Sequence, residues 1–317
     1  MKALIGVDIG GTKIAIVKGN ENGEILEKIR FENDLPPKKA IERILESVKK
    51  MGSADAIGIS CGGPLDTKKG LILSPPNLPG WDEVPIVSLL ENATGIPTFL
   101  QNDADACALA EWKHGAGRGC ESMIFLTFGT GLGAGLILDG RLYAGSSGAA
   151  GEIGHVAMEK DGPIGYGKHG SLEGFCSGGG IRQIAIAKAQ AQFAKGSTPS
   201  FCESPDKLES ITAKVVADCA SDGHADAIEI YRECGYMLGR GLAILIDLLN
   251  PQRIVIGSIY ARSHALLESS MMDALKKEAL PASLANCHIL PAELGETLGD
   301  IAALSVAQNG LERRIGQ

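Results

Sequence analysis

Two glycine-rich turns have residue types that could hold a phosphate group. In LTFGTGLGAGLIL, residues 126–138, alternate glycines follow one apolar run and precede another. DIGGTK, residues 8–13, lies within a similar order of strand, glycine-threonine turn and strand. Glycine lets backbone N–H groups approach an anion closely, so each turn is a candidate phosphate site. A plain hairpin turn is the alternative for either motif taken alone.

The spacing excludes two common nucleotide loops. A Rossmann loop requires G-x-G-x-x-G before a helix, whereas the apolar run LIL and the turn Asp139-Gly140 follow here. A P-loop ends in Gly-Lys-Ser/Thr, which this run lacks. Because the two turns repeat one plan, we expect an internal duplication in which both turns face one ligand.

An acidic residue lies at a predicted junction between a strand and a helix. The chain passes from TFLQNDA into ADACALAEWKHGAG, so Asn102 and Asp103 lie where the strand ends and the helix begins. A carboxylate there could accept the proton of an attacking hydroxyl, and a helix N-cap is the alternative role. The motif Glu152-Ile153-Gly154-His155 is weak alone, because a histidine after glycine is more often structural.

The elements that would position these residues alternate between strand and helix patterns. Three short strands are predicted within residues 3–31, followed by an amphipathic helix over 35–51. A strand over 56–60 then runs into the loop Cys61-Gly62-Gly63-Pro64. A long apolar helix over 228–250 stops before Pro251, a strand follows, and a final helix over 298–312 could pack on the first lobe.

The composition favours a small polar ligand. A chain of 317 residues and 33.0 kDa exceeds the usual size of one domain, so two lobes are predicted. The formal net charge of −8 and the aromatic share of 4% give neither a basic surface nor a stacking platform for nucleic acid. The eight cysteines form no C-x-x-C pair, which favours reduced thiols.

The N-terminal sequence favours a cytoplasmic protein. MKALIGVDIGG has a short apolar stretch interrupted by Asp8, unlike a signal peptide. No run approaches the roughly 18 apolar residues of a membrane span, so we expect no membrane partner.

Taken together, these motifs resemble the ROK family of sugar kinases. The resemblance covers nearly the whole chain and includes both turns, the stretch GGPLDTKKGLILSPPNLPGW at 62–81, Asn102-Asp103 and residues 152–155. It implies an α/β, two-lobe, actin-like or hexokinase-type (ribonuclease H-like) fold with a cleft between the lobes. The expected smaller N-terminal lobe is 1–103 plus 301–317, and the larger C-terminal lobe is 104–300.

The resemblance implies ATP-dependent phosphorylation of a hexose, with the 6-hydroxyl of glucose as the first expectation. N-acetylmannosamine, N-acetylglucosamine and fructose stay open as acceptors, because specificity depends on unpaired polar groups that the sequence does not locate. The cofactors would be ATP and Mg²⁺, and the family's habit suggests a homodimer. A sugar-sensing repressor is the alternative in another class, but such relatives add an N-terminal helix-turn-helix, for which we expect no room before Asp8.

The resemblance also assigns roles to single residues. Asp103 matches the general base, Asn102 matches a residue that holds another sugar hydroxyl, and Gly63 matches a backbone position beside the sugar. Residues matched to ring-hydroxyl ligands are Glu152, His155 and Glu173. Residues matched to the nucleotide are Asp8, which would face Mg²⁺ through water, Gly10, Gly11, Thr12, Lys13, Gly129, Thr130, Gly131 and Gly257. Ser258 stands where the family has a second glycine.

One segment departs from the family pattern. Many members have C-x-C-G-x-x-G-C-x-E where this chain has IGYGKHGSLE, residues 164–173, and there three thiolates and the histidine of E-x-G-H hold a structural zinc. Ile164, Tyr166 and Ser171 occupy the cysteine positions here, so we predict no bound zinc. We expect apolar packing of Ile164 and Tyr166 to hold the loop instead, and Tyr166→Gly to raise the KM for the sugar.

Overall fold

The computed structural model describes residues 1–315, which form two compact units. The first unit comprises Met1–Glu121, Gly135–Ala150 and the chain from Glu293 onward, and the second comprises Ser122–Ala134 and Gly151–Ala292. The structure assigns residues 104–121, 135–150 and 293–300 to the first unit, whereas the sequence led us to expect them in the larger C-terminal lobe. Residues 316–317, which were expected in the smaller lobe, lie outside the described chain. None of the helices in the described chain is long and apolar enough to cross a lipid bilayer.

The first unit is built on a five-stranded sheet with the order β3-β2-β1-β4-β7. Strands β1 (Ala3–Ile9), β2 (Lys13–Asn20) and β3 (Ile25–Glu32) are antiparallel neighbours, whereas β4 (Ala56–Cys61) and β7 (Thr98–Asn102) extend the sheet in parallel. The register pairs Asp8 with Ser60 and Cys61 with Asn102. Because the carboxyl ends of β1, β4 and β7 meet at one edge, Asp8 and Asn102 come together there.

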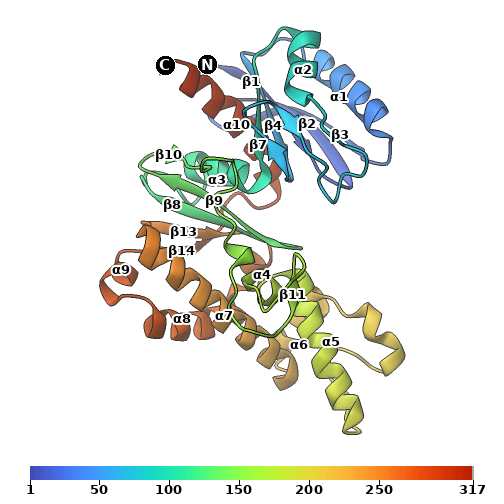
Figure 1. Cartoon of the computed structure of the whole chain (residues 1–317), viewed down its shortest axis with the longest axis vertical. Helices are drawn as coiled ribbons and strands as arrows, with labels where there is room; N and C mark the ends of the chain where they lie inside the picture. The colour runs from blue at the N-terminus through green and yellow to red at the C-terminus, as the bar shows by residue number, and fades with distance from the viewer. Residues whose placement is uncertain (316–317) are drawn as a thin grey trace. The chain divides into compact units, whose positions relative to one another are not determined.

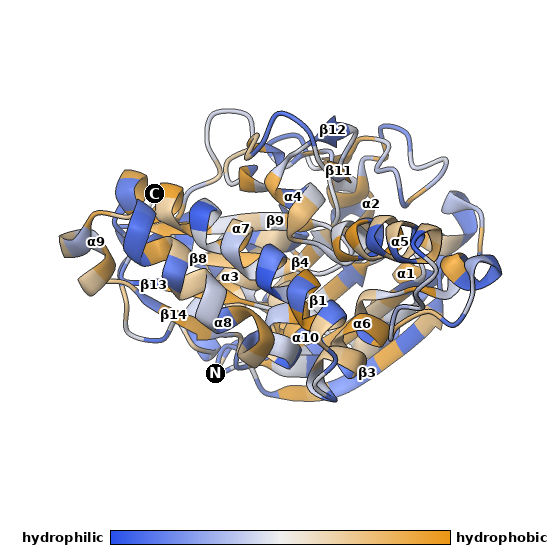
Figure 2. Cartoon of the chain, turned by 90° about the horizontal axis from the view of Figure 1, so that it is seen from below, coloured by the Kyte–Doolittle hydropathy of each residue, from blue (hydrophilic) through white to orange (hydrophobic). Residues whose placement is uncertain are grey.

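Helices cover both faces of this sheet (Figure 1). Helices α1 (Pro37–Met51) and α2 (Ile86–Thr94) lie on one face, and α10 (Leu298–Ile315) covers the other, with α3 (Asp103–His114) packed against α10. Buried Ile44 of α1 joins the core on its face, and Leu304 of α10 packs with Leu4 and Val17 on the opposite face. The outer strand β3 alternates hydrophilic and hydrophobic residues, the pattern of a strand with one face in solvent (Figure 2).

The second unit contains the parallel strands β8 (Met123–Phe128), β13 (Arg253–Ile256) and β14 (His288–Pro291), with β13 in the middle. Strand β9 (Leu132–Leu138) contains a boundary between the units, and the whole sheet has the order β10-β9-β8-β13-β14. Helices α7 (Ala225–Leu249) and α8 (Ile259–Glu278) pack against each other (Figure 1).

Shorter elements complete the two units. In the first unit these are the strands β5 (Leu65–Asp66), β6 (Leu71–Ile72) and β10 (Arg141–Leu142), with the 3-10 helix η3 (Gly295–Thr297). In the second unit they are β11 (Ile164–Gly165), β12 (Lys168–His169), α4 (Leu172–Phe175), α5 (Gly178–Ala194), α6 (Ala213–Ser221) and α9 (Pro281–Ala285), with η1 (Ile153–His155) and η2 (Pro205–Ser210). All eight cysteines are free thiols.

Candidate active site

The first predicted phosphate turn joins β1 to β2. The Gly10 N–H donates to the carbonyl of Lys13 at 3.0 Å, and Asn33 fixes the turn from outside. The Asn33 Nδ2 donates to the carbonyl of Gly10 at 2.8 Å, and its backbone N–H donates to the carbonyl of Thr12 at 2.8 Å. Within residues 1–315 the N–H groups of Gly11 and Thr12 have no acceptor. Such unpaired N–H groups are suitable donors for an anion.

Asp8, at the end of β1, lies close to two further carboxylates. Burial, together with the negative charges of Asp103 and Asp300, raises the pKa of Asp8 to about 7, while Lys28 and Ser60 oppose the shift. The Lys28 ammonium lies 2.5 Å from Asp300. Three carboxylates beside one ammonium leave an excess of negative charge, which fits the presence of Mg²⁺. In the described chain no group of three or more His, Cys, Asp or Glu side chains could hold a metal ion by itself.

Asp103 begins α3 immediately after β7, as predicted. The Ala104 N–H donates to Asn102 Oδ1 at 2.9 Å and to Asp103 Oδ1 at 2.8 Å, and Asn102 is the helix N-cap. The Asp103 side chain is accessible to solvent, yet partial desolvation by the surrounding protein raises its pKa above the ordinary 3.8. An accessible carboxylate with a raised pKa is suited to accept a proton.

The loop after β4 adjoins this pair. A Cβ added to Gly63 would lie 3.4 Å from Asn102 Nδ2, and one added to Gly62 would lie 3.8 Å from Asp103 Oδ2. At Gly11 a Cβ would lie 2.6 Å from the carbonyl of Asn77, so this turn requires glycine. The first unit therefore brings together Asp8, the turn at 10–13, Gly63, Asn102 and Asp103.

The second predicted phosphate turn joins β8 to β9 in the second unit. The Gly129 N–H donates to the carbonyl of Gly131 at 3.0 Å. The N-terminus of α5 packs on the same turn, because the Gly178 N–H donates to the carbonyl of Gly129 at 2.8 Å. In the described chain the N–H groups of Thr130 and Gly131 have no acceptor, so this turn also presents donors.

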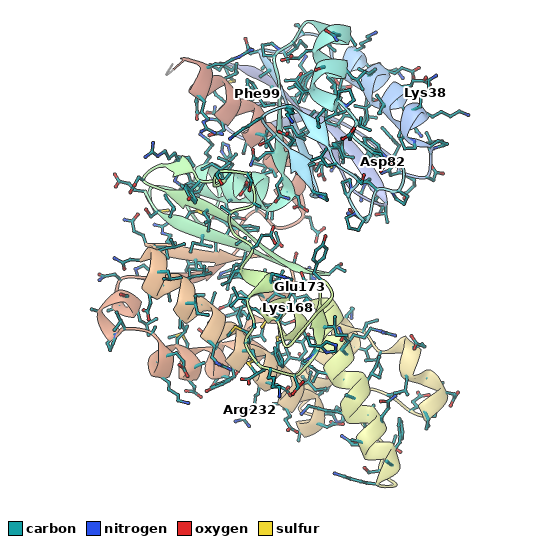
Figure 3. All side chains as sticks on the ribbon, in the orientation of Figure 1. Lys38, Asp82, Phe99, Lys168, Glu173 and Arg232 are labelled. Atoms are coloured by element: carbon teal, nitrogen blue, oxygen red, sulfur yellow. The ribbon has the colours of Figure 1, made fainter. Side chains whose placement is uncertain are left out.

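Glu173 lies where three segments of the second unit meet. Its Oε2 accepts the Leu132 N–H at 2.9 Å, and a Cβ on Gly131 would lie 2.7 Å from the same oxygen. A Cβ on Gly154 would lie 3.4 Å, and one on Gly165 2.8 Å, from the Cβ of Glu173. Figure 3 shows Glu173 and Lys168 in this part of the unit. Glu173 is therefore in direct contact with the end of the second predicted phosphate turn.

The other predicted sugar ligands lie at the two ends of η1, which adjoins α4: Glu152 is its N-cap and His155 its last residue. Glu152 and His155 are both exposed, and the His155 carbonyl accepts a hydrogen bond from Lys168 Nζ at 2.7 Å. The second unit thus brings Glu152, His155 and Glu173 into neighbouring segments. Among the described residues, the Glu152 carboxylate and the His155 imidazole have no partner, whereas Glu173 has one oxygen bonded to the Leu132 N–H.

Gly257 directly follows β13, close to the second turn. Its N–H donates to the carbonyl of Leu126 at 2.9 Å, and a Cβ on Gly129 would lie 3.7 Å from Ser258 Oγ. Ser258 has φ 54° and ψ −113°, a conformation that favours glycine. The backbone geometry of a glycine pair therefore persists although the second residue is serine.

The expected apolar packing of Ile164 and Tyr166 is wrong. Their side chains are 43% and 76% exposed, because the short β11–β12 hairpin turns them outward. Gln183 holds the loop instead, accepting the Ile164 N–H at 2.9 Å and donating to the Ile164 carbonyl at 2.9 Å. Buried Ser171 accepts the Gly174 N–H at 3.2 Å as the cap of α4. Polar contacts therefore hold the segment that carries Glu173.

Several residues in the two sites carry no signal in the sequence. Asn33 and Asn77 contact the first turn, and the glycines at the start of α5 contact the second turn. Lys28 and Asp300 shift the pKa of Asp8. Of these, only the run SGGG at 177–180 could have been noticed in the sequence. Its glycines allow the first turn of a helix to pack closely on another segment of backbone.

The sequence model of the ROK family matches residues 4–309, and the chain belongs to this family. The glucokinase of Thermotoga maritima is 31% identical over 99% of this chain and 98% of its own length. A ROK glucokinase from Streptomyces griseus, solved with glucose and AMPPNP, is 29% identical with a TM-score of 0.75, over 96% of this chain and 99% of its own. The xylose repressor of Caldicellulosiruptor bescii is 28% identical over 95% of this chain and 77% of its own length. The α/β fold of this chain is therefore the actin-like ATPase fold of its structural relatives.

Proposed function

We propose that the protein is an ATP-dependent sugar kinase that phosphorylates a hexose hydroxyl. The observation that carries the proposal is the accessible carboxylate of Asp103, with its raised pKa, beside Asn102 and Asp8 at one edge of the first sheet. The glucokinase relatives support the same reaction, since they match nearly the full length of the chain.

In this proposal Asp103 accepts the proton of the sugar hydroxyl as its oxygen attacks the γ-phosphorus of ATP. The bond from the γ-phosphorus to the bridging oxygen of the β-phosphate breaks, and ADP leaves. Phosphoryl transfer requires mainly positioning and stabilisation of charge. Unpaired N–H groups of the turns at 10–13 and 129–131 would hold phosphate oxygens, with Gly257 toward the adenosine. Bound Mg²⁺, faced by Asp8 through water, would neutralise phosphate charge.

We propose the 6-hydroxyl of glucose as the acceptor. Asn102 and the backbone at Gly63 would hold the sugar near the reacting hydroxyl. The carboxylates of Glu152 and Glu173 and the imidazole of His155 would bind the remaining ring hydroxyls, to which charged acceptors make strong hydrogen bonds. N-acetylmannosamine, N-acetylglucosamine and fructose are the alternative acceptors. A homodimer in the cytoplasm remains a prediction.

The test is a panel of hexoses and N-acetylhexosamines assayed for ADP release with ATP and Mg²⁺. We expect glucose to have the highest kcat/KM and to yield glucose 6-phosphate. If another sugar is preferred, the proposed acceptor is wrong but the proposed kinase activity stands. If no sugar accelerates ADP release over the sugar-free control, the proposed activity is wrong.

A further inference from the structure

A wide groove of about 1220 Å³ runs along the outer edge of the first sheet. Its lining residues all belong to the first unit and include residues 98–101 of the edge strand β7. The C-terminal end of α10, the β5–β6 hairpin, α2 and the segment 141–148 form the walls. Asp8, Asn102 and Asp103 do not line it, so this groove is separate from the candidate active site.

The groove is basic although the protein is acidic. Asp66 and Glu91 are its acidic residues, and both are engaged within the protein. Asp66 accepts the Lys69 backbone N–H at 2.9 Å and lies 3.4 Å from its ammonium, while Glu91 Oε1 accepts the Thr98 N–H at 3.0 Å. The cationic residues that line the groove are Lys68, Lys69, Arg141, Arg313 and Arg314. In a chain of net charge −8 this is a local excess of positive charge.

The arginines of the groove have no acidic partner within residues 1–315. The side chains of Arg141 and Arg313 are exposed and make no hydrogen bond or ion pair with any residue in the described chain. The Arg314 guanidinium lies 5.6 Å from the centre of the Phe99 ring, a cation–π contact, and its N–H groups have no acceptor among the described residues. Figure 3 shows Phe99 close to α10. Lys68 Nζ donates to the Ser146 carbonyl at 3.0 Å and so ties two walls together.

We propose that this groove binds a phosphorylated small molecule. Guanidinium groups match the oxygens of a phosphate group with paired N–H donors, so Arg141 and Arg313 would bind the phosphate. Phe99 and Leu100 of β7 give the lining an apolar part that suits the organic body of a phosphate ester. Small-molecule pockets commonly hold about 300–1000 Å³, so the groove has room for a sugar phosphate or a nucleotide.

The test is calorimetric titration of the full chain with glycerol 3-phosphate and with fructose 1,6-bisphosphate, using sulfate as the control anion. The groove variant Arg141→Ser/Arg313→Ser removes two exposed charges. The control Lys38→Ser/Lys50→Ser removes two exposed charges from α1, where Lys38 points to solvent (Figure 3). We expect wild type, the control and Asp103→Asn to bind at least one ester alike. Binding to the groove variant should be weaker by roughly tenfold or more.

Four outcomes would overturn the proposal: neither ester binds wild type, the groove variant binds as well as wild type, both double variants lose affinity equally, or sulfate binds as tightly as the esters. Equal losses would show an effect of net charge, and tight sulfate binding would show attraction of any anion. The titration requires no catalysis, so its result does not depend on the proposed kinase activity.

Discussion

The Glu173 carboxylate accepts a hydrogen bond from the backbone N–H of Leu132 at 2.9 Å. Leu132 directly follows the second glycine turn, so the contact joins a proposed phosphate turn to the helix that carries a proposed sugar ligand. One carboxylate oxygen is committed to the turn, and the other has no partner within residues 1–315. Glu173 can therefore position the turn with one oxygen and keep the other for the proposed sugar ligand.

Glu173→Ala and Glu173→Gln should separate these two roles. Alanine removes the acceptor of the Leu132 N–H, so we expect weaker binding of both AMPPNP and the sugar, by roughly tenfold each. Glutamine keeps an acceptor oxygen but loses the charge, so AMPPNP binding should stay within about twofold while sugar binding weakens. Calorimetric titration measures both ligands. Unchanged AMPPNP affinity in Glu173→Ala would show that the contact does not support the turn.

Asp8 should make stability depend on pH in the protein free of metal and nucleotide. Its pKa of about 7 in the folded protein exceeds the ordinary 3.8, so between these values the folded state binds more protons than the unfolded state. Stability from this group therefore falls as pH rises through this range and is constant above it. The free energy of unfolding of Asp8→Asn, relative to that of wild type, should therefore rise by on the order of 2–4 kcal/mol between pH 4 and pH 8.

Urea unfolding at several pH values measures this effect. Asp34→Asn, at an exposed site of the same unit, is the matched control and should follow the wild-type pH dependence. If Asp8→Asn also follows the wild-type pH dependence, the surroundings of Asp8 do not raise the pKa of its carboxyl group.

The protein should be more stable with glycine in place of Ser258. A residue with a side chain at φ 54° is strained by about 1–2 kcal/mol, and glycine relieves this strain. The greater entropy of glycine in the unfolded chain offsets part of that gain. Ser258→Gly should therefore raise the free energy of unfolding by about 1 kcal/mol. Ser258→Ala keeps the strained Cβ and should give no such gain. A glycine variant less stable than wild type would show that the hydroxyl group contributes more than the strain costs.

The segment 164–173 should keep its structure without zinc. We predict less than stoichiometric zinc in protein purified without added metal, and an unchanged Tm after chelator treatment. Gln183→Ala removes both bonds to Ile164 and should cost about 1 kcal/mol. Tyr166→Gly should leave stability unchanged or higher, because the tyrosine is exposed at φ 43°. Stoichiometric zinc bound by His155 would contradict this account.

Local patterns in the sequence predicted the parts of the fold that depend on neighbouring residues. The two strand-turn-strand units, the helix that became α1 and the junction at Asp103 follow from apolar periodicity and glycine spacing. The helix predicted over 228–250 was confirmed as α7, which begins at Ala225. These elements form from contacts within a short stretch of chain.

Contacts between distant segments could not be predicted in this way. Asn33, through its side chain and its backbone, and the start of α5, through its backbone, make hydrogen bonds to the two turns across long sequence separations, which no local pattern encodes. Ile164 and Tyr166 were expected to be buried because of their residue types, but a hairpin of two-residue strands has too little surface to cover them. The glutamine that replaces this packing lies on α5, outside the motif.

The central claim is that Asp103 accepts the proton of the sugar hydroxyl. The most direct measurement compares kcat and sugar affinity of Asp103→Asn with those of wild type, using the sugar that turns over best. We predict nearly unchanged sugar affinity and a kcat lower by about 10²–10⁴-fold, the contribution of a general base. A kcat close to wild type would contradict the account.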